Sequence, residues 1–481
     1  MTRLVGLDVG TSSVKGVAVD EEGRVLGIAE RPHPLSTPHP GWSEQDPEDW
    51  WAGAQAVLGE LGAGTAAGIG LTGQMHGLVA LGADDRPLRP AILWNDGRTQ
   101  AECDAIEARV GIERLVALTG NRALAGFTAP KLAWLATHEP EVHAAIEHIL
   151  LPKDHVRLRL TGEHATDVTD ASGTLLFDVA ARAWSPEMCD VLDVPESWLP
   201  PALESGTLSG HTPDGVPVAA GAGDQAAGAL GVGVVRAGGP ASVVLGTSGV
   251  VFAAQDAFAA DPQARVHAFC HAVPGAWHVM GVMLSAAGSL RWLRDAVAPG
   301  LGYDALLAEA EAWAPGVEGL VFAPYLAGER TPYPDADARG GFLGLGLRHD
   351  RGALVRAVLE GVAFGLADGL DLVGDLAGRP PVARVSGGGV RSALWLDIVA
   401  AVLDLPLEVT AVDEGAAYGA ALLGGVAAGT WSDPAEAAAA CVRVTRRVEP
   451  RPDWVARYAE LRPAFRAAYP ALQAVRRAGP A

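Results

Sequence analysis

The fold is decided by one stretch near the start of the chain, Leu4-Val5-Gly6-Leu7-Asp8-Val9-Gly10-Thr11-Ser12-Ser13-Val14-Lys15-Gly16-Val17-Ala18-Val19-Asp20. Two apolar runs flank a Gly-Thr-Ser-Ser turn, which predicts a β-hairpin whose tip exposes backbone N–H groups and hydroxyl groups. Such a tip suits a phosphate group. Asp8 lies just before the tip, and a carboxylate beside a bound phosphate indicates a divalent cation between the two negative groups. The local pattern fits equally an ordinary hairpin whose aspartate caps its own turn.

A second stretch of the same kind begins at Ala241. Residues 241–252 repeat the order of apolar strand, Gly-Thr-Ser tip and apolar strand. A chain of 481 residues is longer than one hydrophobic core usually supports. The two hairpins therefore predict an α/β protein of two domains, residues 1–236 and 237–481.

The composition argues against several classes of protein. The formal net charge is −21 and the chain has no run of Lys or Arg, which argues against a nucleic-acid partner. No apolar segment reaches membrane-spanning length without polar interruption, so we expect a cytoplasmic protein without a membrane partner. The four cysteines lie far apart, which argues against a zinc site or a disulfide framework. The oligomeric state stays open, a homodimer included.

One further bias concerns the basic residues. Of the 36 Lys and Arg residues, only those at positions 15, 131 and 153 are lysines. We interpret this as a property of the coding composition rather than of the mechanism.

Polar side chains follow two further apolar strands. Residues 67–72 lead into Gly73-Gln74-Met75-His76-Gly77, and residues 91–94 lead into Asn95-Asp96-Gly97-Arg98-Thr99. Ligands gather beyond the carboxyl ends of strands in open α/β sheets. This mixture of amide, imidazole, carboxylate and guanidinium groups suits a polyhydroxylated ligand, so the sequence predicts a sugar pocket. The alternatives are a core histidine at position 76 and a plain Asx turn at residues 95–97.

Asp224 is the candidate catalytic base. Residues 217–230 consist of an apolar strand, a turn of small residues, an acid and a helix rich in Ala and Gly. An aspartate at this position caps the helix in most proteins. A capping aspartate needs no surrounding glycines, however, and Gly221 and Gly223 let a ligand approach closely. A shielded carboxylate beside a polyol is what a kinase uses to accept the hydroxyl proton as the phosphoryl group transfers.

The second half contains a glycine turn, Ser386-Gly387-Gly388-Gly389, between a strand and a helix. It nearly matches a dinucleotide fingerprint, but the third glycine is absent, so a platform for an adenine ring or a phosphate fits better than NAD. A small-residue helix beginning near residues 413–421 is expected close to this turn. For Arg330, a local tie to Glu329 is favoured over a phosphate contact. The polar loop over residues 166–173 has no assigned role.

Together these motifs resemble the FGGY family of carbohydrate kinases. In the order of that family they are Asp8-x-Gly-Thr-Ser12, Gly73-Gln-Met-His-Gly77, Leu93-Trp-Asn-Asp-Gly-Arg98, Gly221-x-Gly-Asp224, Leu245-Gly-Thr-Ser-Gly249, Gly328-Glu-Arg-Thr-Pro332 and Ser386-Gly-Gly-Gly389. The resemblance runs to about residue 425. It implies two ribonuclease H-like domains of the actin and Hsp70 ATPase type with a cleft between them. The first domain would hold mainly the sugar and the second mainly ATP.

The same resemblance implies the site residues. Asp224 would be the general base that activates the C5 hydroxyl of D-xylulose, and Asp8 would position Mg²⁺ directly or through water. The sugar would be lined by Gln74, Met75, His76 and Gln225. The phosphates and the adenosine of ATP would be held by Thr11, Ser12, Gly246, Thr247, Ser248, Gly387, Gly388 and Gly389.

The substrate has alternatives. The residue after the catalytic aspartate is often Asn in family members that act on D-xylulose, and here it is Gln225, one methylene longer. Ribulose, gluconate or another ketose or polyol therefore stays an alternative. Glycerol kinases usually carry an Asn-Gln-Arg-Glu-like segment where this chain has residues 74–76, which weighs against glycerol. The rival from another class is an actin-like ATPase that drives assembly, but polymerisation needs no sugar-facing acid such as Asp224.

Overall fold

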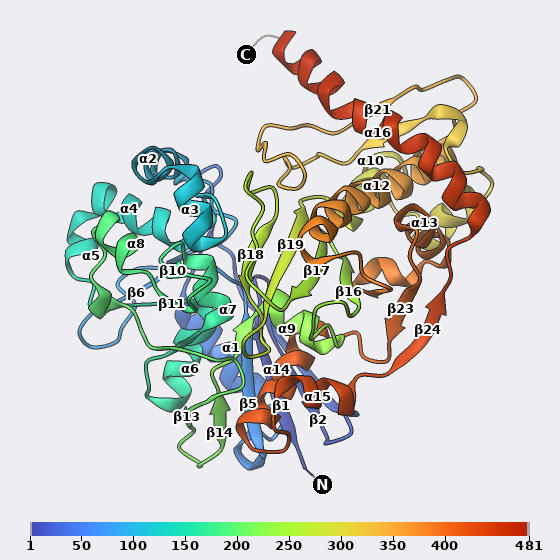
Figure 1. Cartoon of the computed structure of the whole chain (residues 1–481). Coiled ribbons are helices and arrows are strands. Elements are labelled where there is room, and N and C mark those ends of the chain that lie inside the picture. The colour runs from blue at the N-terminus through green and yellow to red at the C-terminus, as the bar shows by residue number, and fades with distance from the viewer. Residues whose placement is uncertain (1, 479–481) are drawn as a thin grey trace.

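Two seven-stranded sheets form the framework of the computed structural model, which describes residues 2–478 (Figure 1). The first sheet has the strand order β13-β14-β5-β1-β2-β3, with β15 also paired to β5. The second has the order β18-β19-β17-β16-β22-β23-β24. Figure 1 shows the first sheet at the bottom, with β1, β2 and β5 in blue and β13 and β14 in green, and β16 to β19 of the second sheet above it.

The first sheet comes from the N-terminal half. Its strands are β1 (Leu4–Val9), β2 (Ser13–Val19), β3 (Val25–Pro32), β5 (Gly68–Gly73), β13 (Leu208–His211), β14 (Pro217–Ala219) and β15 (Ala222–Gly223). β1, β2 and β3 form an antiparallel meander, as predicted from the first hairpin. β5 runs parallel to β1, and β14 and β15 run parallel to β5.

The second sheet repeats this order. Its strands are β16 (Ala241–Leu245), β17 (Gly249–Gln255), β18 (His267–Cys270), β19 (Trp277–Met283), β22 (Ala383–Ser386), β23 (Leu407–Thr410) and β24 (Val444–Val448). β16, β17 and β19 are antiparallel, β22 runs parallel to β16, and β23 runs parallel to β22. Each half is therefore built on three antiparallel strands followed by parallel ones, so the architectural unit is duplicated.

The central strand β17 explains how the halves share a core. All of its residues are buried, and they alternate between two sides. Val251 and Ala253 pack with the long helix α12 (Arg351–Ala377), whereas Val250 and Phe252 pack with helices of the N-terminal half. Because both faces are covered, the strand is a continuous apolar run in the sequence.

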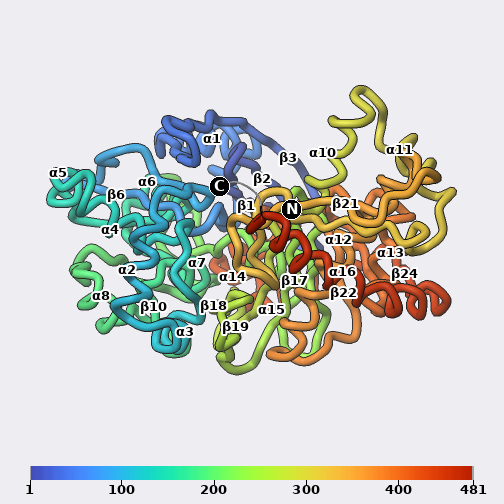
Figure 2. Tube along the Cα trace, turned by 90° about the horizontal axis from the view of Figure 1, so that it is seen from above, coloured from blue at the N-terminus to red at the C-terminus, as the bar shows by residue number. Residues whose placement is uncertain are grey.

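Helices of the N-terminal half form a lobe, seen on the left in Figures 1 and 2. The lobe consists of α2 (Gln100–Val110), α3 (Ile112–Thr119), α4 (Thr128–His138), α5 (Pro140–Ala144), α6 (Pro152–Thr161), α7 (Val168–Ala171) and α8 (Pro186–Val191). Short strand pairs join it: β4 (Glu44–Gln45) with β7 (Ala91–Ile92), β6 (Val79–Leu81) with β8 (His148–Leu150), β9 (Thr166–Asp167) with β12 (Ala202–Leu203), and β10 (Phe177–Asp178) with β11 (Ala183–Trp184).

Two small-residue helices, α9 (Asp224–Gly231) and α14 (Gly415–Ala427), pack against each other and against the first sheet. A Cβ added at Gly6 or at Gly70 would lie 1.9 Å from a carbonyl oxygen of α14, so the helix rests directly on the strand backbones. The sequence predicts this helix beside the turn over residues 386–389, whereas its main partners are α9, β1 and β5. A helix from the C-terminal half thus completes the N-terminal core.

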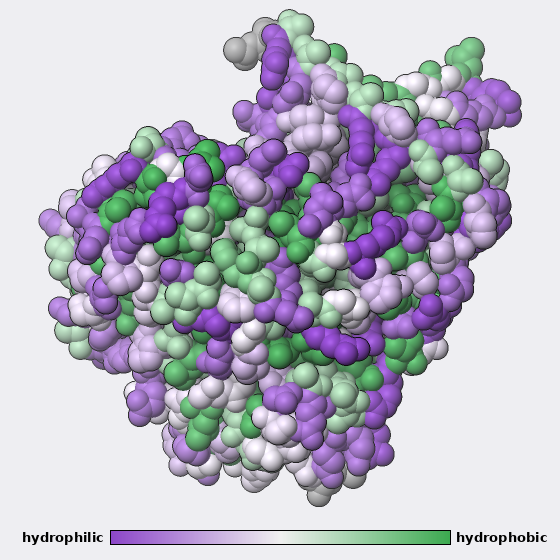
Figure 3. Space-filling view, in the orientation of Figure 1, coloured by the Kyte–Doolittle hydropathy of each residue, from purple (hydrophilic) through white to green (hydrophobic). Residues whose placement is uncertain are grey.

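The remaining elements cover the outer faces. They are α1 (Pro47–Glu60) on the first sheet, α15 (Pro434–Cys441) beside α14, and, around the second sheet, α10 (Ala287–Val297), α11 (Tyr303–Glu311), α13 (Ala393–Leu403), α16 (Pro452–Ala478) and the pair β20 (Val321–Ala323) and β21 (Gly341–Leu343). On the face seen in Figure 3, hydrophobic residues are interspersed with hydrophilic ones. Over residues 2–478, no helix combines the length and the apolar character needed to cross a membrane.

Candidate active site

The carboxyl ends of three strands meet at one edge of the first sheet. Val9 at the end of β1 lies beside Gly73 of β5, and Gly73 lies beside Gly223 of β15. The segments that leave these strands therefore start side by side. They carry the residues predicted for phosphate, sugar and proton transfer: Gly10–Ser12, Gln74–His76 and Asp224.

Asp8 lies at this edge in surroundings that suit a cation. Burial, followed by the negative charge of Asp224, raises the pKa of Asp8 to about 7, although Lys15, its partner across β2, lowers it. Asp8 Oδ1 is buried and accepts no hydrogen bond from residues 2–478. A buried carboxylate oxygen without a donor, next to a second acid, gains most from a bound cation. The residues present therefore fit Mg²⁺.

Asp224 is the first residue of α9, and its carboxylate does not cap the helix. The N-cap residue is Gly223, and no side chain makes a capping hydrogen bond there. Burial raises the pKa of Asp224 to about 6, although hydrogen bonds from Gln225 lower it. Gln225 Nε2 donates to Asp224 Oδ1 at 3.3 Å. Both side chains are half-buried. Asp224 is thus an accessible carboxylate that is ionised at neutral pH.

Thr11 and Gln74 bind each other. The Thr11 hydroxyl donates to Gln74 Oε1 at 3.3 Å and accepts from Trp94 Nε1 at 3.0 Å. Gln74 Nε2 donates to Gln45 Oε1 at 2.9 Å and to the Gly10 carbonyl at 3.4 Å. Gln74 is buried, so its amide joins the first hairpin tip to the next loop. Ser12, at the tip itself, is exposed.

His76 is held in one tautomer. Its Nδ1 lies 2.9 Å from the Gly173 carbonyl oxygen, so Nδ1 carries the proton and Nε2 is left as an acceptor. Burial, with the nearby charge of Lys131, holds the pKa of His76 well below its ordinary value. The ring stacks on Phe127 at 4.4 Å between centroids. His76 therefore combines the two alternatives. Its ring is buried as in a core histidine, but its Nε2 has no protein partner within residues 2–478 and is free to accept a hydrogen bond from a ligand.

Met75 is buried against the backbone at the start of α9. A Cβ added at Gly223 would lie 2.8 Å from Met75 Cγ, and one added at Gly173 would lie 3.5 Å from Met75 Cε. The thioether therefore occupies the space that the two glycines leave beside Asp224.

The second hairpin tip and the glycine turn are neighbours. Gly387 has φ +89°, and a Cβ there would lie 2.9 Å from the Leu245 carbonyl group. The tip is anchored at the start of α10, because the Gly246 and Thr247 carbonyls accept N–H groups of residues 286–288 at 2.8 to 3.1 Å. Thr247 is exposed, Ser248 is half-buried, Gly389 is buried, and a Cβ at Gly388 would meet no atom within 4 Å. The two segments predicted to hold ATP therefore form one surface.

Arg330 corrects a prediction. Its guanidinium makes no ion pair with Glu329, whose Oε1 instead accepts the N–H groups of Arg330 at 2.8 Å and of Leu284 at 3.0 Å. The guanidinium lies 6.0 Å from the Trp94 ring, and Nη2 would lie 3.7 Å from a Cβ at Gly126. Over residues 2–478 it has no hydrogen bond or ion pair of its own. A half-buried cation from the second half thus reaches the loops of the first.

The segment Asn95–Arg98 serves as a structural turn. Asp96 is buried, and its carboxylate accepts the Ser43 N–H at 2.6 Å and pairs with the Arg98 guanidinium at 2.7 Å. The guanidinium in turn stacks on Trp42 at 3.6 Å. The Asp96 carboxylate also accepts the Arg98 N–H at 2.9 Å, which is the hydrogen bond of an Asx turn.

All three lysines of the chain lie near the edge of the first sheet where β1, β5 and β15 end. The sequence pattern did not predict this location. Lys15 forms an ion pair with Glu414, the residue before α14, and Lys131 Nζ donates to the His76 carbonyl at 2.8 Å. Lys153 is buried among three aspartates. The rarity of lysine could have predicted it. In a chain that uses arginine almost everywhere, a lysine indicates a position that needs a compact ammonium group rather than a planar guanidinium.

A duplicated α/β fold, with a phosphate-type tip in each half and an accessible acid beside the first, indicates a phosphotransferase of the sugar kinase class. Sequence profiles of the N-terminal and C-terminal domains of the FGGY family of carbohydrate kinases match residues 3–231 and 241–428. The chain belongs to this family, as its motifs predict. It is therefore an enzyme that uses a sugar and ATP.

Several relatives are similar along most of their length. A xylulose kinase of Escherichia coli strain K12 is 45% identical over 439 residues, which cover 88% of this chain and 90% of the relative. A xylulose kinase of Bacillus subtilis strain 168 is 36% identical, with 96% of this chain and 95% of the relative covered.

Solved structures share the whole fold. The xylulose kinase of Rhodospirillum rubrum matches with a TM-score of 0.91 at 33% identity, covering 98% of this chain and 99% of that one. The gluconate kinase of Lactobacillus acidophilus matches with a TM-score of 0.92 at 26% identity, covering 98% of each chain. The predicted fold class is confirmed.

Proposed function

We propose that this enzyme transfers the γ-phosphoryl group of ATP to the C5 hydroxyl of D-xylulose, giving D-xylulose 5-phosphate and ADP. The observation that carries the proposal is the meeting of Asp8, Gln74–His76 and Asp224 at one edge of the first sheet. The proposal also draws on relatives named xylulose kinase that are 45% and 36% identical over most of their length.

Asp224 acts as the general base. With a pKa of about 6, its carboxylate is ionised at neutral pH yet far more basic than an ordinary aspartate. It accepts the C5 hydroxyl proton as the oxygen attacks the phosphorus atom. Gln225, hydrogen-bonded to Asp224, keeps that carboxylate in place beside the sugar.

Asp8 would hold Mg²⁺, directly or through water. The ion would supply positive charge beside the phosphate oxygens of ATP. Lys15, which faces Asp8 in the strand register and forms an ion pair with Glu414, adds positive charge near Asp8 and lowers its pKa.

The sugar is held by groups that remain free to bind it. His76 Nε2 accepts a sugar hydroxyl hydrogen, Met75 packs against the carbon chain, and the Arg330 guanidinium donates to sugar oxygens. Gln74 acts indirectly, because its amide is engaged with Gln45 and Thr11.

ATP lies across the two tips. Thr11 and Ser12 contact the phosphates from the first half, whereas residues 246–248 and 387–389 contact the phosphates and the adenosine from the second. On this proposal residues 1–236 are the sugar-binding domain and residues 237–481 the ATP-binding domain. A cytoplasmic location, where ATP and free sugars are available, stays a prediction, and so does a homodimer.

The substrate needs a direct test, because the fold itself is shared with a gluconate kinase. ADP release is measured in a coupled assay with D-xylulose, ribulose, glycerol and gluconate. We expect the highest kcat/KM with D-xylulose, by at least about tenfold. A higher value with ribulose or gluconate would assign the enzyme to that sugar and point to Gln225 as the cause. ATP turnover that no sugar changes would instead support the actin-like alternative.

A further inference from the structure

The polar loop predicted over residues 166–173 folds as β9, α7 and a 3₁₀ turn (Ser172–Thr174). This segment, residues 166–174, is buried throughout and touches both candidate site segments. The Thr169 hydroxyl accepts the Gly223 N–H at 2.8 Å, one residue before the proposed base. At the other end of the loop, the Gly173 carbonyl accepts His76 Nδ1 at 2.9 Å. One short segment thus fixes the backbone before Asp224 and the ring of His76.

The same loop also reaches the second half. The Ser172 hydroxyl accepts the Cys270 N–H of β18 at 3.0 Å and donates to the Val168 carbonyl at 2.7 Å. The segment therefore bonds to His76 after β5, to Gly223 at the start of α9, and to β18 of the second sheet. A shift of the loop would move all three together.

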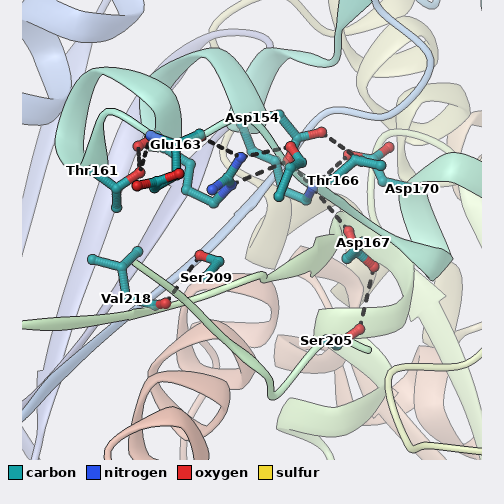
Figure 4. A network of polar contacts seen from close by, with 12 residues as sticks. Asp154, Thr161, Glu163, Thr166, Asp167, Asp170, Ser205, Ser209 and Val218 are labelled. Carbon is teal, nitrogen blue, oxygen red and sulfur yellow. Dashed lines mark hydrogen bonds and ion pairs between the residues drawn. The ribbon is translucent and has the colours of Figure 1, made fainter. Parts of the chain in front are cut away.

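Thr169 is itself held by a buried aspartate. Asp167 Oδ2 accepts the N–H of Thr169 at 2.7 Å, its hydroxyl at 2.6 Å and the Ser205 hydroxyl at 3.2 Å, the last drawn in Figure 4. Because the Thr169 hydroxyl gives its proton to Asp167, its lone pair must face the Gly223 N–H. The hydrogen bonds therefore run in one fixed direction, from the Gly223 N–H to the Thr169 hydroxyl and from that hydroxyl to Asp167.

Lys153 anchors the whole arrangement. Its Nζ lies 2.6 Å from Asp154, 2.9 Å from Asp167 and 3.2 Å from Asp170, and all four side chains are fully buried. Asp154 also accepts the Thr166 hydroxyl at 2.7 Å, as Figure 4 shows. Burial opposes the charge of Lys153, but the three carboxylates raise its pKa above the ordinary value.

Stability alone does not explain such a cluster. A buried ion network can often be replaced by apolar residues of similar volume without loss of stability, because removing charges from water is costly. Its advantage is geometric, since each charged hydrogen bond allows only a narrow range of positions. The network reaches Gly223, the residue before Asp224, through Thr169. This contact indicates that the fixed geometry is needed at the proposed base.

We propose that residues 166–174, anchored on Lys153, form a brace that positions Asp224 and His76 for phosphoryl transfer. Lys153, Asp167 and Thr169 are positioning residues and touch no substrate. The proposal rests on the proposed function of Asp224 and extends it, because it says what holds the base in place.

The test is Thr169→Val, which keeps the shape of the side chain and removes the hydroxyl. We expect kcat to fall on the order of tenfold to a hundredfold, since small displacements of a catalytic group have effects of this size. KM for ATP should stay unchanged. Thr169→Ser, which restores a hydroxyl, should recover most of kcat.

Thr119→Val is the matched control, because it removes a buried hydroxyl that lies outside residues 166–174 and donates to the Leu115 and Asn121 carbonyls. It should lower the melting temperature about as much as Thr169→Val and keep kcat within about threefold. Equal losses of kcat in the two variants, or an unchanged kcat in Thr169→Val, would overturn the brace. If Thr169→Val does not fold, Ser205→Ala removes another partner of the same Asp167 oxygen, and an unchanged kcat there would also overturn it.

Asp224→Asn is measured in the same assays. If it is inactive and Thr169→Val is fully active, the proposed function stands and the brace fails. If Asp224→Asn stays active, the assignment of the base fails, whatever the threonine variants do.

Discussion

The two hairpin tips have the same sequence pattern and different chemistry. Gly-Thr-Ser follows Asp8 and Val9 in the first half, and it follows Val244 and Leu245 in the second. Asp8 pairs with Lys15 across its hairpin, whereas Val244 pairs with Val250. One copy of the duplicated unit thus carries a charged pair beneath its tip, and the other carries an apolar pair.

The tips also differ above the strands. The Thr11 hydroxyl is engaged with Gln74 and Trp94, whereas Thr247 is exposed and its loop is anchored only through backbone carbonyls. The first tip is built into a polar site with acids, and the second presents backbone and glycine. On the proposed function, the first copy of the fold unit would serve the cation and the proton transfer, and the second would contact the phosphates and the nucleotide.

The strongest test of this asymmetry is Asp224→Asn. If the chemistry resides in the first half, kcat should fall by about a thousandfold, since a general base contributes up to this much. Nucleotide affinity, measured by fluorescence titration, should stay within about twofold, because the base acts on the sugar. Gln225→Asn is the neighbouring control and should keep most activity. Sustained turnover in Asp224→Asn would contradict the proposal that the catalytic chemistry resides in the first half.

The second test compares Asp8 with its counterpart Val244. Asp8→Asn keeps the size of the side chain and removes the charge, so we expect turnover to fall by about a hundredfold at low Mg²⁺ and to recover partly as Mg²⁺ is raised. Val244→Ala should leave the Mg²⁺ response unchanged. An identical Mg²⁺ titration for wild type and Asp8→Asn would contradict the assignment of Asp8.

The pH profile tests the acids without any substitution. Asp224 must be ionised to accept a proton, and burial raises its pKa from 3.8 to about 6. The value of kcat/KM for the sugar should therefore be constant above about pH 7 and fall about tenfold per unit below pH 6. An aspartate with an ordinary pKa would keep full activity to about pH 4. If kcat/KM at pH 5 equals its value at pH 7 while circular dichroism shows that the protein is still folded, Asp224 is not the base.

Arg330 tests whether the second half contributes to the sugar site. Arg330→Met should raise KM for the sugar by about tenfold, the effect of losing a hydrogen bond from a charged donor. KM for ATP should change little. Arg330→Lys keeps the charge and should have the smaller effect. If only KM for ATP rises, Arg330 belongs to the phosphate site instead.

The smallest effect is expected for the two tip threonines. Thr11→Val removes two hydrogen bonds and should cost about 1–2 kcal/mol of unfolding free energy. Thr247→Val, at an exposed position, should change that free energy by less than about 0.5 kcal/mol and act only on KM for ATP. Chemical denaturation of both variants measures the difference. Equal destabilisation would mean that the tips are alike in their surroundings.

The sequence by itself determined the duplicated hairpins, the polar ends of β1 and β5, the acid at the start of α9 and the glycine turn. These features are local, because strands and turns depend on the residue types at neighbouring positions of the sequence. They were enough to identify the family and most residues of the proposed site, but not Arg330.

Only the tertiary structure decided which polar groups remain free for a substrate. Within residues 2–478, Gln74 and Asp96 have their groups engaged, whereas Arg330 and His76 Nε2 do not, and the segment predicted as a polar loop over residues 166–173 is buried. The physical reason is that a hydrogen bond or ion pair depends on which distant segments come together. That pairing is set by sheet register and by helix packing through glycines such as Gly6 and Gly70, and no local pattern reports it.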